Sequence, residues 1–261
     1  MTLQEIFVHP LKSCRGNAVQ TAMVEEMGLA HDRRWMLITA EGQFMTGRQY
    51  PKLVLVTASP DAAGVTFEAP GQAPLRVERS EMTETLPVEV WRSAFTAQAG
   101  SWDADFWFSD VLGVNCRLVH IGPDTTRRTS SGPPKAVGFA DGYPVLLIGT
   151  ASLADLNARL ATPVTMRHFR TNLVLETEIP FIEDHWRRVR IGDVEFEMVK
   201  RCSRCIFTTI DPTTAQADAA KEPLSTLNGY RQTDGEAMFG VNLIALNSGS
   251  IQVGDRLTVL A

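Results

Sequence analysis

The most informative stretch of the chain is KRCSRCIFTTIDP, which spans residues 200–212. It places two thiols and two arginines within a few residues and then continues into a β-branched run. A thiolate is a soft ligand for a soft metal, and arginine holds phosphate through paired hydrogen bonds. The combination is expected where a metal arrives already bound to a phosphorylated organic cofactor.

The pair formed by Cys202 and Cys205 also allows two simpler kinds of site. A structural zinc site wants two more closely spaced ligands, whereas Cys14 and Cys116 are isolated and the upstream histidines lie far apart. A thioredoxin-like dithiol should sit where a strand meets the start of a helix. Residues 206–210 instead favour a strand, and the proline that follows predicts its end.

The composition is that of an ordinary soluble globular protein. The chain has 261 residues, 44% hydrophobic and 21% charged, which allows one large domain or two small ones. A net charge of −5 and a pI near 5.6 argue against nucleic acid or an anionic membrane as the main partner. The apolar runs are strand-sized and the N-terminus has no basic, apolar leader, so we expect neither a membrane span nor a signal peptide. Four cysteines, two of them isolated, favour the cytoplasm over a secreted disulfide framework.

About the first 90 residues show the two-residue periodicity of strands. A glycine-containing loop at residues 40–42 predicts one hairpin, and a turn at Pro70-Gly71 predicts another. We therefore expect a small antiparallel β unit. Its predicted strands are residues 5–10, 34–39, 43–46, 53–56, 65–68 and 75–78.

The rest of the chain mixes helices with short strands. Ser101 as N-cap and Gly113 after the last turn predict a helix between them, and the polar, Pro- and Gly-rich residues 127–134 predict an exposed loop. Residues 150–157 and 222–230 predict two more helices. Repeated glycine turns between short strands suggest a barrel with a few packed helices, a mainly β (α+β) fold. The predicted strands are residues 144–148, 172–176, 188–191, 194–199, 241–246 and 257–260.

The residues after the cysteine pair carry a family resemblance. Cys202-Ser203-Arg204-Cys205, followed by TTIDP at residues 208–212, resembles the signature of MOSC-domain proteins, named after the C-terminal domain of molybdenum cofactor sulfurase. More narrowly, the chain is similar to the mitochondrial amidoxime reducing component and to bacterial relatives that lack a ferredoxin domain. Supporting segments occur in the family's order at residues 10–14, 32–35, 46–49, 151–157, 169–172, 221–224, 230–231 and 239–240.

This resemblance implies an N-terminal β-barrel domain at residues 1–93 and a MOSC domain at residues 94–261. It also implies a molybdenum held by a pyranopterin and by one protein thiolate, and Cys205 matches that ligand. Cys205 is thus the expected metal ligand and catalytic residue, whereas Cys202 is expected to be a packing residue nearby. The residues expected to bind the cofactor are Lys12, Ser13, Arg33, Arg48, Arg170, Asn172, Ser203, Arg204 and Cys205.

The chemistry of these residue types agrees with a phosphorylated pterin. Phosphate needs donors without competing acceptors, which arginine and lysine provide, and Asn172 offers both a donor and an acceptor for a pterin edge. Arg34 and Arg201 are expected to be surface or secondary residues. Asp211 and Asn242 are weaker candidates for the substrate side.

The reaction that the resemblance implies is reduction of N-hydroxylated compounds, namely amidoximes, hydroxylamines and N-hydroxylated bases, by cleavage of the N–O bond. The four cysteines are not spaced as the ligands of an iron–sulfur cluster, so electrons are expected from a separate ferredoxin-, flavodoxin- or cytochrome-type protein. The rival hypothesis is a carrier that binds the molybdenum cofactor, or passes sulfur through a persulfide on Cys205, without turnover.

Overall fold

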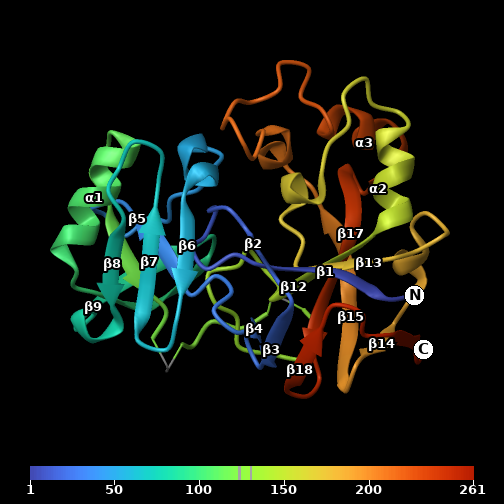
Figure 1. Ribbon diagram of the computed structural model, residues 1–261, viewed down its shortest axis with the longest axis horizontal. Coiled ribbons are helices and arrows are strands. Elements are labelled where there is room, and N and C mark those ends of the chain that lie inside the picture. Colours follow the sequence, from blue (N-terminus) through green and yellow to red (C-terminus); the bar gives the residue numbers. More distant parts are fainter. Residues whose placement is uncertain (123–124, 130) are drawn as a thin grey trace.

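The computed structural model describes residues 1–122, 125–129 and 131–261, and strands make up most of its regular structure. The chain forms two lobes, which lie left and right in Figure 1, and both termini lie in the right-hand lobe. The described strands form four sheets, and the helices are short. The predicted mainly β fold with a few packed helices is therefore confirmed.

One large sheet forms the frame of the right-hand lobe, and both of its faces are buried. Its neighbouring strands are antiparallel, apart from one parallel pair between β12 and β13. Successive side chains of a strand point to opposite faces, so Ile6 and Leu147 enter one hydrophobic core while Phe7 and Ile148 enter another. In spatial order the strands are β19 (Leu257–Val259), β14 (Arg188–Ile191), β15 (Val194–Ser203), β17 (Glu236–Ala245), β12 (Val145–Gly149), β13 (Leu173–Leu175), β1 (Leu3–Val8) and β2 (Asn17–Val19), with β16 (Gln232–Thr233) paired to β17.

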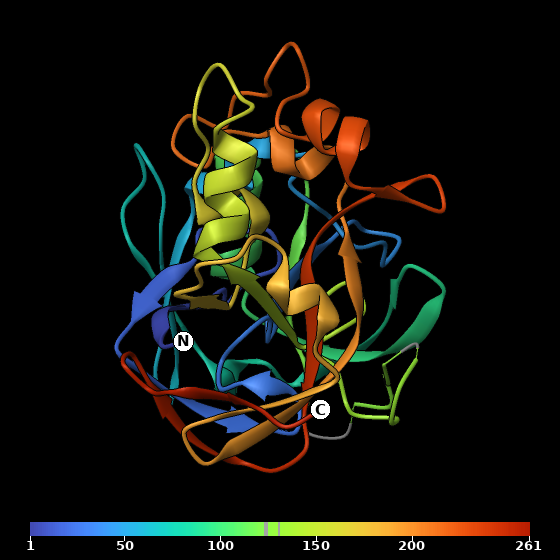
Figure 2. The same cartoon turned by 90° about the vertical axis from the view of Figure 1, so that its right-hand side faces the viewer.

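Short helices cover the face of this sheet that carries Phe7 and Ile148. Leu156 and Leu227, from two different helices, join that core, and both helices lie at the same end of the lobe in Figures 1 and 2. Among the described residues, no helix is long and apolar enough to cross a membrane. The helical segments of this lobe are α2 (Thr150–Asn157), α3 (Leu224–Tyr230) and the 3-10 helices η3 (Met166–Phe169), η4 (Ile182–His185) and η5 (Ile206–Thr209).

The left-hand lobe packs two smaller sheets and a helix around an aromatic core. The ring of Phe67 meets Trp35 edge-on at 6.2 Å and Phe108 at 4.9 Å between centroids. As predicted, the helix begins after Ser101 and ends at Gly113, whose φ of +71° suits glycine. The elements are β5 (Trp35–Ile38), β11 (Arg117–His120), β10 (Ser93–Ala99) and β9 (Glu84–Val90) in one sheet, β6 (Thr57–Pro60), β7 (Gly64–Glu68) and β8 (Leu75–Glu78) in the other, with α1 (Trp102–Leu112), η1 (Pro51–Leu55) and η2 (Arg79–Glu81).

A third small sheet ties the beginning of the chain to its end. β3 (Thr21–Glu25) pairs with β18 (Gly249–Gln252) on one side and with β4 (Gly28–Leu29) on the other. Ile251 and Leu29 of this sheet enter the same core as Ile6 of the large sheet. The two ends of the sequence are therefore structurally interdependent.

Three segments that were predicted as strands have other structures. Residues 53–56 lie mostly in η1, where a proline at the first position fixes φ for a helical turn. Residues 206–209 of the segment 206–210 form η5, because the hydroxyls of Thr208 and Thr209 donate to carbonyls three residues back, at 3.0 and 2.8 Å. In the segment 43–46, Gln43 and Phe44 form isolated β-bridges and no regular strand is present.

The loop predicted at residues 127–134 is not wholly exposed; residue 130 of this range lies outside the described residues. Arg127 is only 6% exposed. Its guanidinium donates to the backbone carbonyls of Gly138, Ala140 and Asp141. Arg127 thus fixes the shape of the segment that leads into β12.

The predicted domain boundary between residues 93 and 94 falls inside β10, which forms one hairpin with β9. β11 pairs with both β5 and β10, so this four-stranded sheet extends to His120. The first strands, β1 and β3, pair instead with β13 and β18. We propose that the division between two units follows β11, which keeps the four-stranded sheet whole.

Candidate functional site

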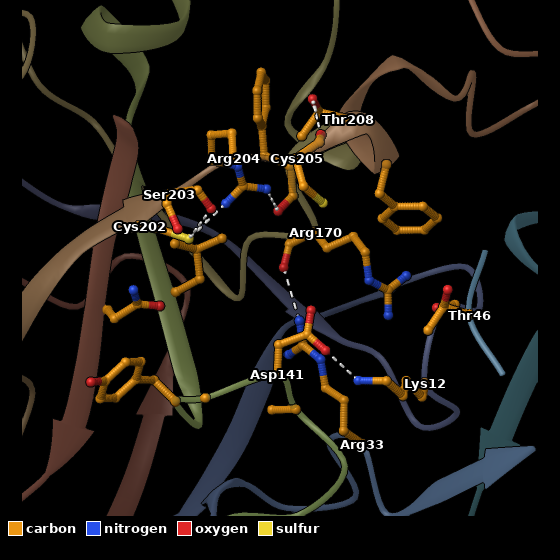
Figure 3. Close-up of a pocket in the computed structure, with 18 of the residues that line it drawn as sticks. Lys12, Arg33, Thr46, Asp141, Arg170, Cys202, Ser203, Arg204, Cys205 and Thr208 are labelled. Carbon is orange, nitrogen blue, oxygen red and sulfur yellow. Dashed lines mark hydrogen bonds and ion pairs between the residues drawn. The ribbon is translucent and has the colours of Figure 1, made fainter. Parts of the chain in front are cut away.

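The nine residues predicted to bind a cofactor all line one cavity of about 360 Å³, which Figure 3 shows in close-up. The cavity is built from segments that are far apart in the sequence, including the turn after β1, the connection between η3 and β13, and the end of β15. The nine are Lys12, Ser13, Arg33, Arg48, Arg170, Asn172, Ser203, Arg204 and Cys205.

Cys205 lies between the end of β15 and the first residue of η5. Its backbone is extended (φ −125°, ψ 177°), and its carbonyl accepts hydrogen bonds from the amide and the hydroxyl of Thr208, both at 3.0 Å. The side chain is exposed, and Nη1 of Arg48 approaches its sulfur at 3.8 Å. The turn of η5 therefore presents an accessible sulfur next to a positive charge, and a soft sulfur ligand needs such access to reach a metal.

Cys202 has different surroundings, although it lines the same cavity. Its side chain is half-buried and packs against the core that contains Phe239. Its sulfur accepts a hydrogen bond from Nη1 of Arg204 at 2.9 Å. The protein itself therefore engages this sulfur, whereas that of Cys205 is open to the cavity.

Arg33 and Asn172 form a network inside the cavity wall. Arg33 donates through Nη1 to Asp32 and to Oδ1 of Asn172 (2.9 Å), and through Nη2 to the carbonyl of Arg170 (3.0 Å). Oδ1 of Asn172 also accepts from the amide of Leu146 (3.1 Å), and its Nδ2 donates to Asp32 (3.1 Å) and to a β1 carbonyl (3.0 Å). Both donors and both acceptors of the Asn172 amide are thus used within the protein. In this arrangement Asn172 orients Arg33 instead of offering an edge to a pterin.

Three cavity residues hold their backbones in the left-handed region. Their φ angles are +69° at Ser13, +48° at Arg33 and +55° at Arg170. Such conformations reduce the free energy of unfolding by on the order of 1–3 kcal/mol per non-glycine residue. They persist where the surrounding contacts hold the backbone in place, commonly at functional sites. The strain concentrates where the chain must aim side chains at the cavity.

Lys12 forms an ion pair at the cavity wall that sequence reasoning did not foresee; Lys12 is buried, whereas the side chain of its partner Asp141 is 57% exposed. Its Nζ donates to the carbonyl of Phe139 at 2.8 Å and to the carboxylate of Asp141. Burial lowers the pKa of Lys12, and the charge of Asp141 acts against that change. Burial alone would raise the pKa of Asp141, but Lys12 and Arg48 outweigh it and bring the pKa below its usual value. Asp141 therefore stays ionised beside two cations.

Three buried polar atoms of the cavity have no hydrogen-bond partner among the described residues: Oγ1 of Thr46, Nη2 of Arg170 and Nε of Arg204. Burial, with the nearby charge of Arg33, lowers the pKa of Arg170 to about 10, so the guanidinium is still charged at neutral pH. Buried polar atoms are nearly always hydrogen-bonded in folded proteins. These three donors fit a ligand that brings several acceptor oxygens, as a phosphorylated pterin does.

The charge of the cavity points to the same class of ligand. Six cationic side chains and one carboxylate line it within the described ranges, although the whole chain carries a net charge of −5. An acidic protein that gathers cations in one hollow is suited to bind an anion there. The six cations are Lys12, Arg33, Arg48, Arg170, Lys200 and Arg204.

A metal site made wholly of protein ligands is not found in the part of the chain that the structure describes. No group of three or more His, Cys, Asp or Glu side chains there is placed to hold a metal ion. A structural zinc ion at the cysteine pair would therefore lack its further ligands. One accessible thiolate fits a metal that brings its remaining ligands with it.

Four further residues that the sequence offered as weaker candidates differ in whether they line the cavity. Asn242 lines the cavity, whereas Asp211 lines a different hollow beyond η5. Arg34 is buried and pairs with Glu25 at 2.9 Å, so it is not a surface residue, and Arg201 is exposed and lies 3.6 Å from Asp184. Neither arginine lines the cavity.

The comparisons with known proteins show the family of the chain. The family described as the MOSC N-terminal beta barrel domain matches residues 1–115, and the MOSC domain family matches residues 134–258. Mitochondrial amidoxime-reducing component 1 is 35% identical in Mus musculus, over 99% of this chain and 82% of that protein, and 34% identical in Homo sapiens, over 99% and 83%. Mitochondrial amidoxime reducing component 2 of Rattus norvegicus is 34% identical over 97% and 82%. The chain therefore belongs to the family of two-part MOSC-domain proteins that includes the mitochondrial amidoxime-reducing components.

Proposed function

We propose that the protein is a molybdenum-cofactor oxidoreductase that reduces N-hydroxylated compounds, such as amidoximes and hydroxylamines, by breaking the N–O bond. The observation that carries the proposal is the accessible sulfur of Cys205 at the edge of a cationic cavity with unpartnered buried donors. The names of its relatives, amidoxime-reducing components, support the same substrate class.

Different residues of the cavity would bind the oxygens of the cofactor, bind its metal, and balance the negative charge near the metal. Thr46, Arg170 and Arg204 offer free donors to its oxygens, and Cys205 supplies the thiolate for the metal. Arg48, 3.8 Å from that sulfur, balances the negative charge that gathers there. When bound, the cofactor supplies a two-electron redox centre.

The overall reaction consumes two electrons and two protons. The N–O bond breaks, the nitrogen gains a hydrogen where the hydroxyl was, and the oxygen leaves as water. We propose that the electrons come from a separate ferredoxin-, flavodoxin- or cytochrome-type protein that docks near Cys205, where the sulfur and the neighbouring Ile206 are exposed. Weak redox encounters of this kind use small interfaces. A cytoplasmic location stays a prediction.

The decisive experiment uses protein made in a host that synthesises the cofactor. We expect one molybdenum per chain, pterin fluorescence after oxidation, and reduction of benzamidoxime to benzamidine with a reduced viologen dye. Stoichiometric zinc without pterin would contradict the proposal. A protein that carries molybdenum and pterin but turns over no N-hydroxylated substrate would instead be the carrier.

A second experiment tests the electron supply. The isolated holoenzyme should not oxidise NADH or NADPH in the presence of substrate, and turnover should appear when a small electron-transfer protein and its reductase are added. NADH oxidation by the isolated protein, coupled to substrate reduction, would show that the chain holds a further redox group.

A further inference from the structure

One exposed aromatic residue stands beside the cavity without lining it. Trp91 is the first residue of the two-residue turn between β9 and β10, and β9 lies in the left-hand lobe. Its φ is +56° and it is 49% exposed. A two-residue hairpin turn favours glycine or asparagine at positions of positive φ, so a tryptophan there is an outlier that its own turn does not account for.

Two contacts of Trp91 are with charged groups near Cys205. The guanidinium carbon of Arg48 lies 4.7 Å from the centre of the tryptophan ring, in a cation–π arrangement. The indole Nε1 donates to Oδ1 of Asp141 at 3.3 Å, and the ring of Phe44 packs against Trp91 with 5.3 Å between centroids. Trp91 therefore holds a cation and a carboxylate of the cavity at the same time.

Arg48 stands between two possible anionic partners. Its Nη1 is 3.8 Å from the sulfur of Cys205 and 4.0 Å from Oδ2 of Asp141. A carboxylate is the partner to which guanidinium binds best, through two parallel hydrogen bonds. In the structure, Arg48 makes no such bidentate pair: its guanidinium carbon lies over the ring of Trp91, and Oδ1 of Asp141 is already engaged by Lys12 and by the indole.

We propose that Trp91 is a positioning residue that keeps Arg48 beside the sulfur of Cys205 by preventing its collapse onto Asp141. This inference deepens the proposed function, since Cys205 is the proposed metal ligand. The geometry on which it rests belongs to the protein alone, and it can be measured without cofactor or substrate.

The first measurement follows Arg48 directly in cofactor-free protein. The Nε–Hε signal of Arg48 in a nitrogen–proton correlation spectrum, assigned by its loss in Arg48→Lys, should be displaced by the tryptophan ring. Trp91→Ala should move this signal to the position of a free arginine, and Trp91→Phe should keep much of the displacement. Trp102→Ala is the matched control, because Trp102 is also exposed and lies 5.9 Å from an arginine, Arg117, and neither residue lines the cavity.

The second measurement follows the sulfur. Alkylation of Cys205 by iodoacetamide at neutral pH, read by peptide mass spectrometry, should slow in Trp91→Ala by up to about fivefold, the upper range for an exposed ion pair. Adding Asp141→Asn to Trp91→Ala should restore the rate, because the competing carboxylate is gone. Asp141→Asn alone reports any separate effect of unpairing Lys12.

An unmoved Arg48 signal in Trp91→Ala would overturn the inference, and so would a moved signal with an unchanged alkylation rate or a double variant as slow as Trp91→Ala. Both measurements use cofactor-free protein. If the protein shows these effects but binds no molybdenum in a cofactor-producing host, the proposed function is wrong and the inference about Trp91 still holds. Melting temperatures of all variants show that the protein stays folded.

Discussion

At the scale of single residues, two cysteines three positions apart have separate surroundings. Cys202 packs against the core and accepts a hydrogen bond from Arg204, whereas Cys205 is exposed next to Arg48. Identical side chains thus have different surroundings because β15 ends between them and η5 begins directly after Cys205.

Substitution of the two cysteines should therefore have unequal effects. Cys205→Ser should abolish reduction of an amidoxime and lower the molybdenum content, because a hydroxyl is a poorer ligand than a thiolate for this metal. Cys202→Ser should keep much of both, since serine still accepts the hydrogen bond of Arg204. Steady-state kinetics and metal analysis check this, and equal losses in the two variants would favour a dithiol mechanism.

Removal of single arginines should separate direct from indirect cofactor contacts. Arg170→Ala should weaken retention of the pterin by about 1.5–3 kcal/mol, the range for a hydrogen bond to a charged group, and Arg170→Lys should not fully restore it. Arg33→Ala should act through Arg170, whose carbonyl Arg33 holds at 3.0 Å.

Pterin content after gel filtration measures both effects. Arg201→Ala is the matched control, because Arg201 is exposed and does not line the cavity. Undiminished pterin in Arg170→Ala and Arg33→Ala would show that these arginines do not hold the cofactor.

At the scale of elements, the three α-helices and many of the strands were predictable. The 3-10 helices were not, and neither were strands such as β3, β9, β10 and β18. The β-branched residues of η5 suggest a strand by propensity, but the hydroxyls of Thr208 and Thr209 bond to nearby carbonyls and close a turn. Propensity describes side chains on a pleated surface, so it misses local hydrogen bonds that compete with the ladder.

A similar limit applies to the site. The residues in the family's motifs could be placed from the sequence, because their order along the chain is characteristic. Asp141 and Trp91 could not, since one stands in a Gly- and Pro-rich loop and the other in a hairpin turn. Their roles arise only when the two lobes meet.

One element depends on a glycine in its middle. Gly240 in β17 has a φ of +77°, and a Cβ there would lie 2.6 Å from Cγ1 of Ile148 and 2.8 Å from the carbonyl of Leu147. Gly240→Ala should destabilise the protein by at least about 1–2 kcal/mol from the left-handed backbone alone, with the clash added to it. Urea unfolding measures the loss.

Gly235→Ala isolates the backbone part of that cost. Gly235 has a φ of +81°, and an added Cβ would meet nothing within 4 Å. It should therefore cost less than Gly240→Ala. Equal destabilisation by the two variants would show that β17 and β12 separate easily enough to absorb the extra atom.

At the scale of the whole molecule, buried histidines make stability depend on pH. Burial, with the charges of Arg79 and Arg34 nearby, lowers the pKa of His120 from 6.5 to about 4, and its ring lies 4.5 Å from that of Trp35. Between these two values the unfolded chain binds a proton that the folded chain does not. Stability should therefore fall as the pH drops from about 6.5 to 4, with a slope of up to about 1.4 kcal/mol per pH unit from this group.

His120→Asn should flatten that dependence, whatever it costs at neutral pH. Urea unfolding at several pH values between 4 and 7.5 gives the two slopes. Parallel curves for the variant and the natural chain would show that His120 takes up its proton equally in both states.

The pairing of β3 with β18, which links the two ends of the chain, has a consequence for biosynthesis. A nascent chain carries β3 without β18 until almost every later residue has left the ribosome. The cavity shares this delay, because Lys12 is made long before Cys205. The lining of the cavity is complete only after Asn242 has been made. Until then the edges of the early strands are open to mispairing. We therefore expect folding of this chain to benefit from chaperones.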